Sequence, residues 1–335
     1  MACLIVLVMH AFSILYPASF PYLRGGGKYG VWLFFVLSAF LLSLRLQQRG
    51  LGITPMVDYA LGRCLRILPP FALACLLYYW AGIGIESGAQ LIDALTFRQG
   101  FIHLWTVPVE FKFYLLLPLL CGTAIALQRR HGDSALLLAL LCTLCLQQWL
   151  WPYWQTPWDS PATRWYLAPF LFGTASALLL PRWRALPRQC MATLFALATL
   201  TALIVALPGT RLWLFGTPLS IDLMNKHVYL GLLWAIFVGL LVDGQGLAGR
   251  LLCSRPLCFL GRISYSAYLF HWLIMVKLGN HLTNQPLAIP AALLLTIAAG
   301  TAGYYLIEHP LERLRKSLTR LTAAQKTTRR LGMDG

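Results

Sequence analysis

The sequence predicts an all-helical, polytopic integral membrane protein: a bundle of about ten transmembrane helices with both termini in the cytoplasm. Three observations predict this fold class. The 335 residues are 59% hydrophobic and 11% charged, with a mean hydropathy of +0.67, whereas a soluble domain carries about 25% charged residues. Apolar windows of helical length recur along the whole chain, and the segments between them differ in their content of basic residues.

Ten apolar windows are close to the roughly 20 residues that a helix needs to cross about 30 Å of hydrocarbon. No alternation of apolar and polar residues competes with the helical interpretation. We therefore expect a transmembrane domain at residues 1–308 and a short basic cytoplasmic tail at 309–335. The windows cover residues 1–16, 29–46, 66–85, 111–127, 134–151, 165–181, 190–208, 227–243, 257–278 and 288–307.

The first window carries one histidine, His10, within the apolar run LIVLVMHAFSIL. This window begins at residue 1 without a charged flank, and no small-residue cleavage site follows it. The pattern therefore does not indicate a secretory signal. We interpret the window as a transmembrane helix that lacks its first turns.

The third and fourth windows open on polar side chains. Arg63 and Arg66, in GRCLRILPP, are three residues apart and should project together at the inner surface. In HLWTVPVEFKFYLLLP, Glu110 lies at the outer boundary of the fourth window, one turn before Tyr114. We expect polar groups that reach deep into the bilayer to face partners or a watery cavity, because an exposed charge there costs about 2.5–3.5 kcal/mol on insertion scales.

The ninth and tenth windows add a second set of polar residues. Ser264, Tyr268 and His271 are spaced i, i+4 and i+7, which places them on one stripe of a helix. This stripe should face the interior of the bundle. Glu308 closes the tenth window at the inner boundary.

The nine cysteines lie almost entirely inside windows or on the predicted inner side, so disulfides are not expected. Cys142 and Cys145 have the spacing of a metal or redox pair, but they stand in a leucine-rich window without a nearby histidine. We interpret them as packing residues and predict no metal site.

The basic residues orient the predicted bundle. With both termini inside, eighteen of the 27 Lys and Arg residues fall on inner segments, eight fall on outer segments, and one lies within the ninth window. Cytoplasmic loops retain basic residues, so this bias favours the orientation. It also explains the net charge of +16 through contact with anionic membrane lipid, without a nucleic-acid partner.

Six segments of the chain carry further information when they are taken in order. They are VLVMHAF, GGKYGVWLFFVLSAFLLSLRL, GRCLRILPP, HLWTVPVEFKFYLLLPLL, FLGRISYSAYLFHWLIM and YYLIEHPLER. Together they resemble the acyltransferase 3 family of membrane acyltransferases, which includes bacterial polysaccharide O-acetylases. This resemblance implies transfer of an acyl group, usually acetyl, from a cytoplasmic acyl-CoA to a hydroxyl of a carbohydrate or lipid-linked saccharide outside the membrane. It implies a multi-pass protein of the bacterial inner membrane, with acetyl-CoA as a substrate and no permanently bound cofactor.

By the same resemblance, His10 matches the essential histidine of the first helix, and Arg63 with Arg66 matches an arginine pair on the third. The family normally carries a basic residue about three helical turns before that histidine. That position would precede Met1 here. A truncated chain and an impaired enzyme therefore stay open as alternatives.

Chemistry gives these residues roles. A neutral imidazole can take the proton of an attacking hydroxyl, or it can carry the acyl group as an acyl-imidazole, and the sequence leaves both roles open for His10. Guanidinium groups suit the CoA phosphates. The candidate residues are His10, Glu110 and His271 for catalysis, Arg63 and Arg66 for acyl-CoA, Ser264, Tyr268 and Tyr114 for the acceptor cavity, and Ser38 and Glu308 for structural or secondary roles.

Each assignment has an alternative. His10 and His271 could tie helices together, the two arginines could be anchors on the positive inner side, and the two glutamates could fix neighbouring helices. For the whole chain, the alternatives are a polysaccharide or lipid-linked saccharide transporter or flippase and a catalytically inactive scaffold subunit. The sequence assigns no oligomeric state.

Overall fold

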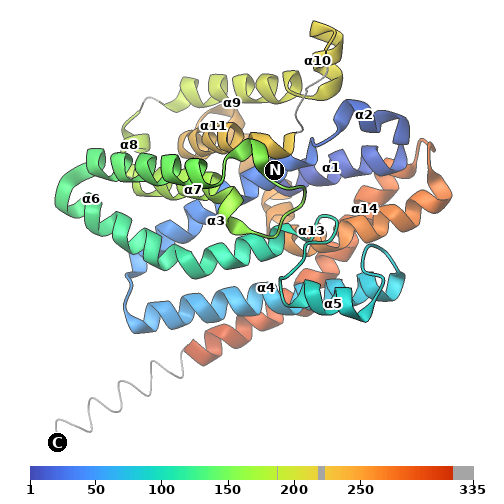
Figure 1. Cartoon of the computed structure of the whole chain (residues 1–335), viewed down its shortest axis with the longest axis horizontal. Helices are drawn as coiled ribbons and strands as arrows, with labels where there is room; N and C mark the ends of the chain where they lie inside the picture. Colours follow the sequence, from blue (N-terminus) through green and yellow to red (C-terminus); the bar gives the residue numbers. More distant parts are fainter. Residues whose placement is uncertain (187, 218–222, 320–335) are drawn as a thin grey trace, which may run out of the picture.

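The computed structural model describes residues 1–186, 188–217 and 223–319 (Figure 1). Within these residues the chain forms fourteen α-helices and no strand, so the all-helical prediction is confirmed for them. The helices are α1 (Ala2–Leu15), α2 (Phe20–Leu23), α3 (Gly27–Arg49), α4 (Ile53–Ala81), α5 (Gly88–Leu95), α6 (Thr106–Leu150), α7 (Leu167–Leu178), α8 (Leu180–Ala185), α9 (Arg188–Val205), α10 (Pro208–Phe215), α11 (His227–Leu241), α12 (Gly246–Leu252), α13 (Arg255–Leu282) and α14 (Ala288–Gly303).

Shorter helical segments connect these elements. The 3₁₀-helices are η1 (Pro17–Ser19), η2 (Tyr153–Gln155), η3 (Thr163–Tyr166) and η4 (Leu223–Lys226), and a π-helical turn, η5 (Tyr304–Glu308), continues α14. The predicted tail at 309–335 begins as a continuation of this helix, and its residues from 320 onward lie outside the described part of the chain.

Four described helices are long and apolar enough to cross a membrane by themselves: α3, α4, α6 and the helix that runs from Ala288 to Thr319. Three bent pairs meet the same test only when both members are combined. These pairs are α1 with residues 17–23, bent by 115°, α9 with α10, bent by 80°, and α11 with α12, bent by 92°. Length and composition thus support four to seven spans, and the count of ten stays a prediction.

Two helices begin earlier than their apolar windows indicate. α4 begins at Ile53 rather than near residue 66, so Arg63 lies in its interior, and α6 begins at Thr106, so Glu110 lies in its second turn. Hydropathy misses the first turns of α4 because they carry the charged Asp58, which is buried against arginines of neighbouring helices. α6 breaks at Gly132, where φ is 81°, and this break separates the fourth and fifth windows as the sequence predicts.

α3 is the central helix, with α1 on one side and α7 on another. Small residues allow these close approaches. A Cβ atom at Gly30 would lie 2.4 Å from the carbonyl oxygen of Ala2 on α1, and one at Gly173 would lie 2.3 Å from that of Val36. Glycine at such positions lets helix backbones approach closely, as is common in membrane bundles.

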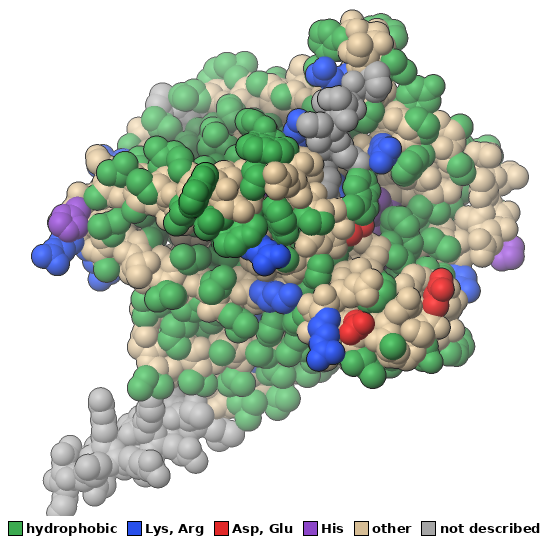
Figure 2. Space-filling model, in the orientation of Figure 1, with side chains coloured by type: hydrophobic (Ala, Val, Ile, Leu, Met, Phe, Trp, Pro, Cys, Tyr) green, Lys and Arg blue, Asp and Glu red, His purple; other side chains and the backbone are tan. Residues whose placement is uncertain are grey.

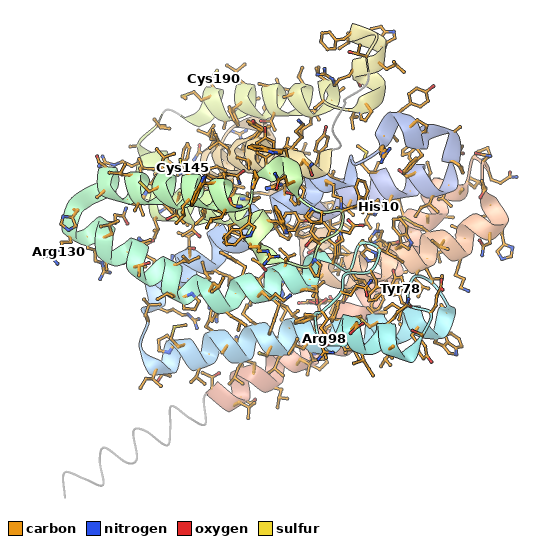
Figure 3. The ribbon with its side chains drawn as sticks, in the orientation of Figure 1. His10, Tyr78, Arg98, Arg130, Cys145 and Cys190 are labelled. Atoms are coloured by element: carbon orange, nitrogen blue, oxygen red, sulfur yellow. The ribbon has the colours of Figure 1, made fainter. Side chains whose placement is uncertain are left out.

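Basic residues gather at one end of the bundle, which we call the arginine-rich end. Figure 1 shows the break in α6, α8 and the connection from α3 to α4 on the left of the view, and Figure 3 places Arg130 at that extreme, away from His10. Hydrophobic side chains cover much of the visible face between the two ends in Figure 2. The arginine-rich end is defined by Arg45, Arg49, Arg129, Arg130, Arg182, Arg184 and Arg315.

Candidate functional site

A cavity of about 470 Å³ lies between α1, α3, α4, α6 and α13, within the range usual for small-molecule sites. It collects most of the residues that the sequence singles out, although they come from four separate helices. Its lining includes Ser38 of α3, Arg63 and Arg66 of α4, Glu110 and Tyr114 of α6, and Ser264 and Tyr268 of α13. His10, His271 and Glu308 are not in the lining.

Two arginines of α4 supply positive charge to this cavity. Arg63 and Arg66 lie one turn apart on α4, and neither forms an ion pair with a carboxylate in the described part of the chain. The guanidinium carbon of Arg63 lies 5.8 Å from the centroid of the Tyr114 ring. Guanidinium groups that line a cavity without a carboxylate partner favour an anionic ligand.

A carboxylate lies further along the same cavity. Glu110 Oε1 accepts hydrogen bonds from Ser38 Oγ and from Tyr114 OH, which joins α3 to α6. The sequence places Glu110 at the outer boundary and the arginines at the inner surface, but the structure brings them into one cavity. The reason is geometric, since α4 and α6 both begin before their apolar windows and overlap along the bundle.

Tyr268 and Thr106 line the end of the cavity that lies nearest the histidines. Tyr268 OH donates to the carbonyl oxygen of His103 at 2.8 Å and lies 2.8 Å from Thr106 Oγ1. The Phe34 ring packs against Tyr268, with 5.7 Å between centroids. These hydrogen bonds fix the Tyr268 ring between the cavity and the histidines behind it.

His10 and His271 form a hydrogen-bonded pair across α1 and α13, with 2.8 Å between His10 Nδ1 and His271 Nε2. His271 Nδ1 lies 2.6 Å from the carbonyl oxygen of Tyr268. A carbonyl oxygen only accepts, so His271 Nδ1 carries the proton, and in neutral rings His271 Nε2 then accepts from His10 Nδ1. This inferred proton arrangement leaves the lone pair of His10 on Nε2.

The second nitrogen of His10 packs against the first residue of α3. A Cβ atom at Gly27 would lie 2.8 Å from His10 Nε2, so the ring position requires glycine there. No described side chain or backbone group forms a hydrogen bond with this nitrogen. His10 Nε2 is therefore the atom of the pair that could accept a proton from a substrate.

A third histidine, His103, joins this group, and sequence reasoning assigned it no role. Its buried ring lies 4.5 Å from the His271 ring and 6.0 Å from the Trp272 ring, measured between centroids. Burial, followed by the neighbouring rings of His271 and His10, lowers the pKa of His103 well below its usual value. His103 stands in the segment HLWTVPVE, but a histidine between helices has no helical spacing that would reveal its partners.

Sequence reasoning also assigned no role to Lys28, which follows Gly27 directly. Its ammonium lies 2.6 Å from Asp159 Oδ1, 4.3 Å from the Trp105 ring centroid and 5.5 Å from that of Trp158. These partners come from connecting segments far apart in the sequence. Charged and aromatic groups therefore lie beside the α3 terminus on which His10 packs.

Glu308 lies outside the cavity. Its Oε1 accepts from Ser266 Oγ at 2.5 Å and from the Ser266 N–H at 3.2 Å, which ties η5 to α13. This arrangement matches the structural alternative for Glu308. Ser264, on the cavity side of α13, donates to the carbonyl oxygen of Gly261 at 2.9 Å.

Within residues 1–186, 188–217 and 223–319, no group of three or more His, Cys, Asp or Glu side chains is arranged to hold a metal ion. The imidazole, carboxylate and guanidinium groups described above offer proton transfer, nucleophilic attack and anion binding. The side chains that offer these three kinds of chemistry lie in one cavity or directly behind it.

Comparison with known proteins points to the same chemistry. A family model described as an acyltransferase domain, acyltransferase 3, matches residues 1–307. A Bacillus subtilis (strain 168) protein named "Putative peptidoglycan O-acetyltransferase YrhL" is 25% identical over 353 aligned positions, which cover 90% of this chain and 54% of that relative. The chain thus spans about half the length of this curated relative. No solved structure matched the chain.

Proposed function

The chain belongs to the acyltransferase 3 family, a family of enzymes that transfer acyl groups, and from that premise we propose that it is a membrane O-acetyltransferase. In this proposal acetyl-CoA occupies the arginine-lined cavity and the acceptor is a hydroxyl of a carbohydrate or lipid-linked saccharide. The name of the Bacillus relative, which refers to peptidoglycan, supports a saccharide acceptor. Membership of an acyltransferase family favours this reaction over a transporter or flippase.

The shape and charge of the cavity support acyl-CoA as the donor. CoA carries phosphates at one end and the thioester at the other, joined by a long flexible arm. The α3 residues that line the cavity run from Val31 to Arg45, which corresponds to about 21 Å at 1.5 Å per residue. The arginines lie toward the Arg45 end of this stretch, and Tyr268 lies against Phe34 near the Val31 end. The CoA phosphates would therefore bind at the Arg45 end, and the thioester would point toward Tyr268.

The histidine pair supports acid–base catalysis by His10. In our proposed reaction, His10 Nε2 takes the proton of the acceptor hydroxyl while the hydroxyl oxygen attacks the thioester carbonyl carbon. The carbon–sulfur bond then breaks, and His10 returns the proton to the departing CoA thiolate. His271, held by the Tyr268 carbonyl, keeps the lone pair of His10 on Nε2 and stabilises the charged ring that forms.

The location of His10 supports substrates that approach from two sides. The cavity with its arginines lies on one side of the histidine pair, and the glycine terminus of α3 with Lys28 lies on another. The donor would use the first side and the acceptor would use the second. This division suits a reaction in which an acyl group leaves a cytoplasmic carrier for an acceptor outside the membrane.

The proposal also includes the membrane arrangement. Apolar helices and the family assignment identify a membrane protein, and we propose ten spans in the bacterial inner membrane with both termini on the cytoplasmic side. The arginine-rich end, where Figure 3 places Arg130, supports this orientation, because cytoplasmic segments retain basic residues. The bacterial source of the relative supports the location.

One observation carries the function: the hydrogen-bonded pair of His10 and His271 lies behind an arginine-lined cavity. The test uses purified protein in liposomes with labelled acetyl-CoA and peptidoglycan fragments. We expect CoA release that depends on the acceptor, with the label recovered as an ester on the saccharide. Label that crosses the membrane without any ester formed would overturn the proposal in favour of a transporter. Label retained on His10 before acceptor is added would identify the acyl-imidazole route.

A further inference from the structure

The cavity contains a third arginine that the sequence did not single out. Arg45 of α3 lines the cavity together with Arg63 and Arg66. Its side chain is 29% exposed, and its only described hydrogen bond runs from Nη2 to Asp58 Oδ2 at 2.8 Å. The other N–H groups of this guanidinium are therefore available to a ligand in the cavity.

Arg45 lies at the end of the cavity farthest from Tyr268, and two helices give the same order. Along α3 it is the last lining residue, about 21 Å beyond Val31. On α4 its partner Asp58 precedes Arg63 by five residues, or about 8 Å, on the side away from the histidines. The three arginines are thus arranged in the order Arg66, Arg63, Arg45 away from the histidine pair.

Asp58 holds Arg45 in this position. The buried carboxylate also accepts from Arg49 at 2.7 Å and from Thr319 at 3.1 Å, and it pairs with Arg315. Arg315 also pairs with Glu312 at 2.6 Å. Three guanidinium groups therefore face two carboxylates, so the cluster keeps one positive charge after its internal pairing. A fixed guanidinium with surplus positive charge around it is suited to an anion of more than one charge.

We propose that Arg45 binds the 3′-phosphate of the donor's nucleotide. This inference rests on the proposed function, because it takes acyl-CoA as the ligand of the cavity. Along acyl-CoA the groups follow the order thioester, pantetheine arm, pyrophosphate and nucleotide with its 3′-phosphate. With the thioester toward His10, the pyrophosphate reaches Arg63 and Arg66, and the phosphate beyond it reaches Arg45.

Arg49 provides a matched control for this assignment. Arg45 and Arg49 both donate to the same oxygen of Asp58, at 2.8 and 2.7 Å. Arg49, however, does not line the cavity, and its side chain is 56% exposed. Replacing either arginine by glutamine removes a comparable ion pair from Asp58, but only Arg45→Gln removes a guanidinium from the cavity.

The experiment measures the affinity of the full-length protein in detergent for two probes, acetyl-CoA and acetyl-dephospho-CoA, which lacks only the 3′-phosphate. Isothermal titration at one fixed, low ionic strength gives Kd for the unsubstituted protein, Arg45→Gln, Arg49→Gln and Arg63→Ala. We expect Arg45→Gln to weaken acetyl-CoA binding by roughly tenfold to a hundredfold and to leave acetyl-dephospho-CoA binding unchanged. Arg49→Gln should leave the affinity for both probes unchanged, and Arg63→Ala should weaken the binding of both probes.

The other outcomes separate the two proposals. Equal losses in Arg45→Gln and Arg49→Gln, or an equal loss of both probes in Arg45→Gln, would overturn the assignment of the 3′-phosphate. An unchanged Arg45→Gln beside a weakened Arg63→Ala would also overturn it while leaving the donor site in place. If the unsubstituted, folded protein binds neither probe, both the donor proposal and this inference fail.

Discussion

His10 Nε2 is the atom on which the proposed reaction depends, because every other nitrogen of the His10 and His271 pair is already engaged. His271 Nδ1 faces the Tyr268 carbonyl, and the two remaining nitrogens face each other at 2.8 Å. The pair therefore leaves one lone pair for a substrate. Two predictions separate the roles of the two rings.

His10→Ala should abolish acyl transfer while expression and membrane insertion stay normal, because alanine is accommodated in an apolar helix at least as well as histidine. Loss of general base catalysis alone costs on the order of 10²–10⁴ in rate. Acceptor-dependent release of CoA from labelled acetyl-CoA measures the effect. Near-normal turnover in this variant would reduce His10 to a packing residue.

His271→Ala should lower kcat less than His10→Ala, by about tenfold to a hundredfold, the cost that is typical when the outer hydrogen-bond partner of a metal-bound imidazole is removed. The KM for acetyl-CoA should stay unchanged, because His271 does not line the cavity. Steady-state kinetics with a saturating acceptor separates the two constants. A loss as complete as that of His10→Ala would instead make His271 a direct participant in proton transfer.

Arg63 belongs to the donor side of the site. We expect Arg63→Ala to weaken acetyl-CoA binding by roughly tenfold to a hundredfold, since a hydrogen bond to a charged group contributes about 1.5–3 kcal/mol. Arg63→Lys should retain part of the affinity through its charge but lose the fork geometry. Isothermal titration measures both variants. Unchanged affinity in folded Arg63→Ala would leave this arginine as an anchor of the positive inner side.

Sequence reasoning found several of these residues but not their partners. Spacing on one helix predicts that Ser264 and Tyr268 share a face, and both line the cavity. It carries no information about Ser38 on α3 meeting Glu110 on α6, because that contact depends on how two helices pack. His103 was missed for the same reason, since only the fold brings it beside His271.

At the scale of helices, the position of the site depends on close packing around α3. Gly30 and Gly173 lie at backbone approaches to α1 and α7, where a Cβ atom would come within 2.4 Å and 2.3 Å of a carbonyl oxygen. These contacts place the α3 face that runs from Val31 to Arg45 toward the cavity. Separation of α3 from α7 would disturb that face without touching any proposed catalytic group.

Gly173→Leu should therefore destabilise the folded protein, because overpacking a tight interface costs about 1–3 kcal/mol and this site meets a backbone atom that cannot move aside easily. Thermal unfolding in detergent, followed by far-UV circular dichroism, measures the loss as a lower Tm. Gly88→Leu on α5 is the matched control, since a Cβ atom there meets no atom within 4 Å. A Tm for Gly173→Leu equal to that of the control would contradict the described contact between α3 and α7.

Apolar windows located most helices but misplaced the starts of two that matter. Windows detect the stretch of a helix that contacts hydrocarbon, whereas α4 begins with turns that carry Asp58. A charged residue lowers the hydropathy of a window even when ion pairs make it stable inside the protein. The proposed donor site lies around these turns. A hydropathy window therefore locates the membrane-spanning part of α4 but does not detect the end of this helix that holds the site.

For the whole molecule, the position of the arginines at one end of the bundle predicts its orientation in the membrane. The arginine-rich end holds the break of α6, where Figure 3 places Arg130. Ion pairs of Arg182 with Asp133 and of Arg184 with Asp243 also lie at this end. Arg45, at the far end of the cavity, belongs to the same group. A cytoplasmic donor would thus enter where positive charge is greatest, which raises its local concentration.

The final prediction tests this direction. In a cysteine-free background, Arg130→Cys and Gln155→Cys place single thiols at exposed sites, the first beside the break of α6 and the second in η2, at the opposite end of the α6 segment that follows the break. If the arginine-rich end faces the cytoplasm, a membrane-impermeant maleimide added to intact cells should label only Gln155→Cys. Both variants should react after the cells are opened, which serves as the control for accessibility. Labelling of Arg130→Cys alone in intact cells would invert the orientation and place the three arginines on the wrong side for a cytoplasmic acyl-CoA, whereas equal labelling would mean that this segment does not cross the membrane.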